Sequence, residues 1–159
     1  MDPLCQPTVF AAIERLLAQR GVPYRVLRHS PVFTSEAAAE IRGAPLASGA
    51  KALVCKADER YLLLVLPADR KLDSRRVRKE QGWKSLRFAD RDEVQRLTGL
   101  APGSIPPFGS LFQLPTLCDP RLGDNEAINF NAGDHSISIS MTYGDYALIE
   151  QPQLALIGD

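Results

Sequence analysis

Apolar residues recur at helical spacing in several stretches of the chain, and capping residues mark where most of these stretches begin. Near the start, one apolar stripe follows Thr8 and stops before Gly21, which is the pattern of a capped amphipathic helix. Farther along, Asp90 and Glu93 have the spacing of a capping box. With capping residues included, the sequence predicts helices over residues 8–21, 34–41, 73–81, 90–99 and 143–150.

Other stretches show the pattern of β-strands. From Ala50 to Ala57, Lys51, Leu53 and Cys55 share one face of a predicted strand. Residues 61–66 are almost wholly apolar, which predicts a central strand buried on both faces. Further strands are predicted over residues 23–27, 110–114, 128–130 and 136–141. Because helices and strands do not alternate strictly, we expect an α+β fold: a single domain over residues 1–159, with a mixed β-sheet and flanking helices.

Composition narrows the classes of function. The 159 residues are 45% hydrophobic and 24% charged, with a formal net charge of zero, so no global field draws the chain to DNA or to a membrane. No apolar run approaches the ~20 residues that span a bilayer, and residues 1–6 lack a signal-peptide pattern. The three scattered cysteines indicate reduced thiols and a cytoplasmic protein. The sequence predicts no metal site and no cofactor.

Four features of the sequence could carry chemistry, and the first two are a lysine and a loop. Lys51 would sit at the edge of a pocket if its strand face is the inner one, where it could hold a phosphate or a developing negative charge; otherwise it extends to water. The Pro/Gly-rich segment from Gly103 to Gly109 could hold backbone N–H groups against an oxyanion, or it could simply connect two elements.

The segment from Asn131 to His135 is predicted to be a tight turn between two strands. His135 alternates in phase with the apolar residues that follow, so it is either a satisfied core histidine or a site residue, while Ser136, Ser138 and Ser140 are expected to face solvent. A basic stretch over residues 70–84 could contact phosphates or form a solvated helix face. No nucleophile has an evident base beside it in the sequence.

Several short motifs stand in the order found in one family of proteins. They are His29-Ser30-Pro31 with Thr34 and Ala37-Ala38, Lys51, Leu66-Pro67-Ala68-Asp69, Leu72-Asp73, Arg78-Lys79, Phe88-Ala89, Glu93-Val94, Leu97-Thr98-Gly99, the loop Gly103 to Gly109, and Phe130-Asn131-Ala132-Gly133. In this order the chain resembles the YbaK/ProX family, the editing domains associated with prolyl-tRNA synthetase.

The resemblance implies hydrolysis of aminoacyl-tRNA that carries the wrong amino acid. Lys51 matches the functional lysine of the family, Gly103 and Pro107 match its G-x-x-x-P loop, and His135 matches a pocket histidine of some branches. We therefore expect catalysis to involve Lys51 and the N–H groups near Gly103 and Ser104, with water or the vicinal ribose hydroxyl as nucleophile. The expected substrate-binding residues are His29, Thr34, Ile105, Pro106, Pro107 and His135.

The amino acid removed is predicted from two departures. Ala52 follows Lys51 where the alanine branch of the family has asparagine, and His135 is present where the cysteine branch lacks it. Serine or threonine is therefore favoured over alanine or cysteine, on tRNA(Pro), with prolyl-tRNA synthetase as candidate partner. The alternatives are a non-catalytic module of the same fold that binds aminoacyl-tRNA or the synthetase, and an enzyme for another activated ester.

Overall fold

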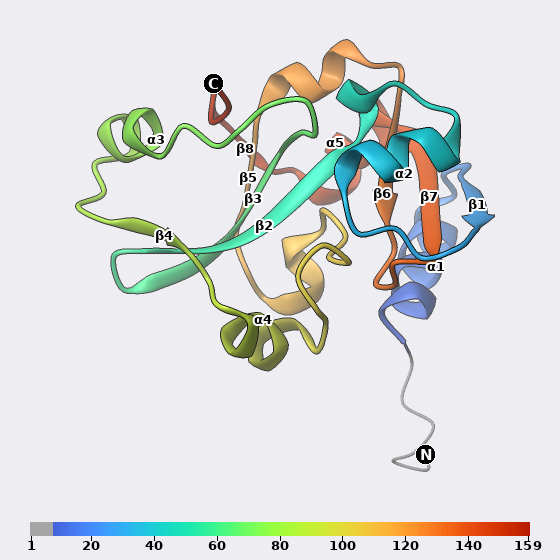
Figure 1. Cartoon of the computed structure of the whole chain (residues 1–159), viewed down its shortest axis with the longest axis horizontal. Coiled ribbons are helices and arrows are strands. Elements are labelled where there is room, and N and C mark those ends of the chain that lie inside the picture. The colour runs from blue at the N-terminus through green and yellow to red at the C-terminus, as the bar shows by residue number, and fades with distance from the viewer. Residues whose placement is uncertain (1–7) are drawn as a thin grey trace.

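Two β-sheets and five α-helices form the part of the chain that the computed structural model describes, residues 8–159 (Figure 1). A three-stranded antiparallel sheet has the order β1-β7-β6, and a five-stranded mixed sheet has the order β4-β2-β3-β5-β8. The expected α+β class is confirmed, with the strands divided between two sheets. The strands are β1 (Arg25–Arg28), β2 (Ala50–Ala57), β3 (Arg60–Pro67), β4 (Leu86–Phe88), β5 (Thr116–Cys118), β6 (Ala127–Asn131), β7 (Ile137–Thr142) and β8 (Gln153–Leu154).

Local capping forms the helices where the sequence predicts them. Thr8 accepts a hydrogen bond from the Ala11 N–H at the start of the first helix, and the capping box of Asp90 and Glu93 is complete. The helices are α1 (Val9–Arg20), α2 (Ser35–Arg42), α3 (Ser74–Gln81), α4 (Arg91–Thr98) and α5 (Tyr143–Glu150), and short 3₁₀ turns lie at η2 (Leu46–Ser48), η3 (Gly109–Phe112) and η4 (Pro120–Asp124).

The β2–β3 hairpin is the long central element of the fold. The two strands pair antiparallel from Ala50 opposite Pro67 to Ala57 opposite Arg60. Leu63 to Leu66 are completely buried, which confirms the prediction of a central strand covered on both faces. One core cluster on this sheet extends to α1 and the small sheet, and a second contains Val77 of α3 and Ile157.

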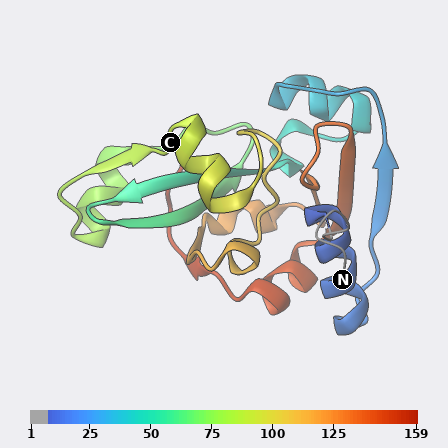
Figure 2. The ribbon, with the colours of Figure 1, turned by 90° about the horizontal axis from the view of Figure 1, so that it is seen from below.

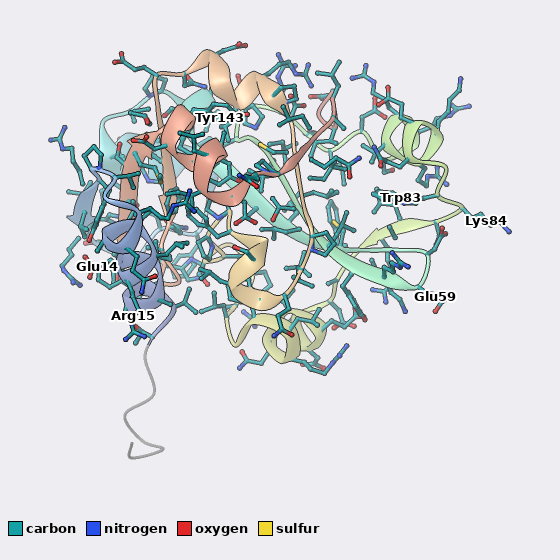
Figure 3. All side chains as sticks on the ribbon, turned by 180° about the vertical axis from the view of Figure 1, so that it is seen from behind. Glu14, Arg15, Glu59, Trp83, Lys84 and Tyr143 are labelled. Atoms are coloured by element: carbon teal, nitrogen blue, oxygen red, sulfur yellow. The ribbon has the colours of Figure 1, made fainter. Side chains whose placement is uncertain are left out.

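The molecule has two ends. Figure 3 shows Glu59, Trp83 and Lys84 at the end where the hairpin turns, and Glu14 and Arg15 on α1 at the other. Figure 2 shows β1 at the outer edge of the molecule, beside β7. Among the described residues, no helix is long and apolar enough to cross a membrane.

The predicted strand at residues 110–114 is wrong. These residues belong to η3 and the turn that follows it, where Gln113 has a positive φ of 58°. Glu150 of α5 accepts hydrogen bonds from the backbone N–H and hydroxyl of Ser110 and from the hydroxyl of Thr116. This distant carboxylate stabilises a tight reversal, so the strand begins only at Thr116.

Candidate functional site

A cavity of about 240 Å³ lies where the start of α2, strand β2, strand β6 and the loop after α4 meet. Four of the predicted site residues line it, namely Thr34, Lys51, Gly103 and Ile105. They come from segments that are up to 71 residues apart in the chain, so the fold assembles them. Figure 1 shows α2 beside the N-terminal end of β2, and residues of both elements line the cavity.

Lys51 is the cationic residue that β2 contributes to the cavity. Its side chain is half-buried, and its ammonium donates a hydrogen bond to the carbonyl oxygen of Arg70 at 2.9 Å. Burial lowers the pKa of Lys51, while the carboxylates of Glu36, Asp159 and Asp69 favour its charged form. An ammonium has three donors, so two remain for a substrate oxygen.

The loop that follows α4 also contributes residues to the wall of the cavity. Gly103 has a φ of +89°, a conformation that favours glycine, and its carbonyl accepts a 2.7 Å hydrogen bond from the side chain of Asn131. Among residues 8–159, the N–H groups of Gly103 and Ile105 have no hydrogen-bond partner. The loop therefore presents two available donors on residues that line the cavity.

Ser104 does not fit the role predicted for its N–H group. Both its N–H and its hydroxyl donate to the carbonyl of Ala101, at 3.2 and 2.8 Å, and its side chain is buried away from the cavity. Its carbonyl accepts from the Gly133 N–H at 2.9 Å. Ser104 thus ties the loop to the turn after β6, and the donor next in line is Ile105.

Four predicted substrate-binding residues lie outside the cavity wall. Pro106 and Pro107 are buried behind it, and the Pro107 carbonyl accepts a 2.7 Å hydrogen bond from the buried hydroxyl of Tyr146. His29 contacts Ser138 instead, with Nε2 2.8 Å from the serine hydroxyl. These residues hold elements in place around the cavity.

His135, the fourth of them, lies in the turn before β7 rather than on the apolar face of that strand. Its Nδ1 is 3.1 Å from the carbonyl oxygen of Val32, and its ring packs on Phe33 with centroids 4.7 Å apart. A Cβ added to Gly103 would lie 3.2 Å from its Cε1 atom. His135 therefore supports the back of Gly103 and the exposed ring of Phe33, which itself lines the cavity.

The structure adds two polar residues that the sequence analysis gave no role. Arg42 donates to the Ser138 hydroxyl and to the Asn131 side-chain oxygen, both at 2.9 Å, and Asn131 in turn holds Gly103. Both residues line the cavity. Ser138 is buried at 2% exposure by these contacts, so the prediction that it faces solvent is wrong. Asn131 belongs to the motif Phe130-Asn131-Ala132-Gly133, whereas the only sequence feature that marks Arg42 is its place as a basic residue in the last turn of a helix.

The remaining candidates lie elsewhere. The cysteines that the structure describes, Cys55 and Cys118, are buried free thiols, and burial raises the pKa of each to about 12, which is unsuited to a nucleophile. In the basic stretch, Arg76 pairs with Asp73 and also donates to the Gly158 carbonyl, and α3 contributes nothing to the cavity. Within residues 8–159, no three His, Cys, Asp or Glu side chains gather as a metal site.

A cavity lined by a lysine and by residues whose backbone N–H groups have no partner within residues 8–159 can hold an acyl group and the negative charge that develops on its carbonyl oxygen. The family model described as "Aminoacyl-tRNA editing domain" matches residues 29–148, and the chain belongs to this family. The predicted family and the predicted class of editing hydrolase are thereby confirmed.

The chain is similar over most of its length to proteins named as a tRNA deacylase and an editing protein. It is 39% identical over 144 residues to the multifunctional Ser/Thr-tRNA deacylase ProXp-y of Escherichia coli (strain K12), covering 87% of this chain and 86% of that protein. It is 24% identical to the prolyl-tRNA editing protein ProX of Acetoanaerobium sticklandii, covering 91% and 90% of the two chains. A crystal structure of a candidate trans-editing enzyme for prolyl tRNA synthetase shares the fold, with a TM-score of 0.82, 24% identity and coverage of 97% and 99%.

Proposed function

We propose that this chain removes serine and threonine from mischarged tRNA, tRNA(Pro) included, by hydrolysing the aminoacyl ester in trans. The observation that carries the proposal is the cavity that Lys51, Gly103 and Ile105 line together, in a chain 39% identical to a Ser/Thr-tRNA deacylase. The expected compartment is the cytoplasm, and prolyl-tRNA synthetase is the candidate partner.

In the proposed mechanism, the backbone of the loop stabilises the tetrahedral intermediate. Water attacks the ester carbonyl carbon directly, or the vicinal ribose hydroxyl attacks first and moves the acyl group onto its own oxygen, and water then attacks that new ester. The negative charge that develops on the carbonyl oxygen is held by the N–H groups of Gly103 and Ile105. In the hydrolytic step the carbon–oxygen bond to the ribose breaks, the proton given up by water passes to the ribose oxygen, and the free amino acid leaves. Lys51 anchors the terminal adenosine through its two remaining donors.

No side-chain nucleophile is required, because an aminoacyl ester is already activated and the fixed loop contributes orientation. Hydrolysis of a substrate with a 2′-deoxy terminal adenosine separates the two nucleophiles. A full rate excludes the ribose hydroxyl as nucleophile, whereas a lost rate shows that this hydroxyl takes part in the reaction.

Specificity for a hydroxyl-bearing amino acid needs a polar contact inside the cavity. His135 lies outside the wall, so we assign this contact to Thr34, whose Oγ1 accepts from the Ala37 N–H at 3.1 Å and keeps its own proton to donate. A site built to hydrogen-bond a hydroxyl discriminates strongly against substrates that lack it. We expect Thr34→Ala to lower removal of serine more than removal of alanine, and Thr34→Ser, which retains the cap and the hydroxyl, to act as wild type.

The decisive test is deacylation of tRNA(Pro) charged separately with serine, threonine, alanine, cysteine and proline. We expect wild type to release serine and threonine, to spare proline, and to lose this activity in Lys51→Ala. Lys56→Ala is the matched control, because Lys56 lies on the same strand, packs over the ring of Tyr61 and does not line the cavity. Binding of charged tRNA without release of any amino acid would refute the proposal in favour of a non-catalytic module.

A further inference from the structure

Arg42 is a partly buried cation without an acidic partner among the described residues. It forms no ion pair, and its two hydrogen bonds go to the neutral side chains of Ser138 and Asn131. Desolvation lowers the pKa of Arg42 to about 10, and no carboxylate offsets this effect. A guanidinium has five N–H donors, so three are left unused in the structure.

A purely structural role accounts poorly for this arrangement. Arg42 lies in the last turn of α2, where a cation is favoured by the free carbonyls of the helix end. Its guanidinium instead contacts side chains of β6 and β7, which are 89 and 96 residues away in the chain. Burying a charge without a counter-ion is unfavourable, so the same tie would be made more stably by a neutral side chain.

The position of Arg42 suggests what the missing counter-ion is. A second, more open groove of about 490 Å³ lies against the small sheet, and Arg42 is the one described residue that lines both this groove and the Lys51 cavity. Hydroxyl and amide side chains are prominent in the groove wall, among them Ser48, Asn129 and Ser140. The Lys51 cavity alone is smaller than the roughly 300–1,000 Å³ that enclose a drug-sized ligand, so the nucleotides next to an aminoacyl group must extend beyond it.

We propose that Arg42 binds a phosphodiester of the single-stranded 3′ end of tRNA, where the strand passes from the Lys51 cavity into the groove. The proposal rests on the proposed function for the identity of the ligand. A guanidinium fork matches phosphate oxygens in a bidentate way, and Ser138 and Asn131 hold the Arg42 side chain at the boundary before the ligand arrives. The groove then receives the nucleotide on the 5′ side of the terminal adenosine.

The test compares a ligand that contains phosphodiesters with one that contains none. Binding of a fluorescent CCA trinucleotide and of adenosine is measured for wild type, Arg42→Lys, Arg42→Gln and Arg15→Gln. Arg15 is the matched control, because it is an exposed arginine on α1 that lines neither cavity (Figure 3). We expect Arg42→Gln to weaken CCA binding by about 10- to 100-fold, as for loss of a hydrogen bond to a charged group, and to leave adenosine binding unchanged.

Two further readouts separate binding from a structural role. Removing one phosphate contact should reduce the slope of log affinity against log salt by about 0.7, whereas a positioning role would leave the slope unchanged. Arg42→Lys, which retains the charge but not the fork, should keep part of the CCA affinity. Equal weakening of CCA and adenosine binding in both variants, or CCA affinity in Arg42→Gln equal to that of wild type, would overturn the assignment.

The outcome for Arg42 is distinguishable from the outcome for the proposed function. The trinucleotide measurement needs no turnover. If wild type releases no amino acid, the proposed deacylase activity is refuted, and the effect of Arg42→Gln on CCA affinity still decides whether Arg42 binds phosphate. Conversely, if wild type is active and Arg42→Gln has the same KM for seryl-tRNA(Pro) as wild type, only the phosphate site is refuted.

Discussion

Gly103 is the residue at which backbone conformation and chemistry can be tested together. Its φ of +89° is unfavourable for any residue with a Cβ, and a methyl group there would lie 3.2 Å from Cε1 of His135. A non-glycine residue in such a conformation costs about 1–3 kcal/mol. The contact with the histidine ring adds to this, because the ring must shift by a few tenths of an ångström. We therefore expect Gly103→Ala to lower the free energy of unfolding by about 2–4 kcal/mol.

Alanine substitutions at two other glycines separate the cost of the backbone conformation from the cost of the contact with His135. Gly21 also has a positive φ, but a Cβ there meets nothing within 4 Å, so Gly21→Ala should show the backbone cost alone, about 1–2 kcal/mol. Gly144, in α5, does not have a positive φ, and a Cβ added there would meet nothing within 4 Å. Gly144→Ala should therefore raise the free energy of unfolding by about 0.5–1 kcal/mol. Urea denaturation of the three variants measures these differences.

The same substitution tests the oxyanion assignment. Relief of the strain moves the Gly103 N–H, and a displacement of about 1 Å in a catalytic group can cost about 100-fold in rate. We expect Gly103→Ala to lose most of its kcat for seryl-tRNA(Pro), and Gly21→Ala to retain wild-type kcat below its melting temperature. The reasoning is refuted if Gly103→Ala is as stable as Gly144→Ala, or if a destabilised Gly103→Ala deacylates at the wild-type rate.

Two further predictions concern buried groups. Burial alone would raise the pKa of Asp119, but hydrogen bonds from Arg121 and from the N–H groups of Gly158 and Ile157 outweigh it and lower the pKa to about 2. Because the folded pKa lies below the unfolded one, this stabilisation, about 2.5 kcal/mol from the pKa difference, is complete above about pH 4 and is lost as pH falls towards 2. Denaturation of Asp119→Asn from pH 7 to 2 should show a loss of roughly 3–5 kcal/mol at neutral pH that shrinks with acid; a constant difference contradicts this. The two buried cysteine thiols should resist a thiol reagent at pH 8 in the native state and react after denaturation, and rapid native reaction would contradict their burial.

The two sheets show where prediction from sequence succeeds and where it stops. The strands β2 and β3 were predicted because one shows two distinct faces and the other is an almost wholly apolar run, whereas their pairing as a hairpin comes from the structure. The short strands β4 and β8 were missed, since three and two residues carry too little pattern. The segment after Gly109 was assigned to a strand because nothing nearby reveals that Glu150 draws Ser110 and Thr116 together.

The sequence by itself determined the helices, the two central strands and the membership of a family. Capping by Thr8 and the box of Asp90 and Glu93 act within a few residues, so they can be predicted locally, and motif order placed Lys51 and Gly103 in one site. Only the tertiary structure decided which side chains share that site. Arg42 is held at the cavity by hydrogen bonds to Asn131 and Ser138, which lie on β6 and β7, far away in the chain. His135 does not line the cavity, because it packs behind Gly103 and Phe33. Such contacts depend on how two sheets and a helix pack together, and the spacing of residues along the chain carries no information about them.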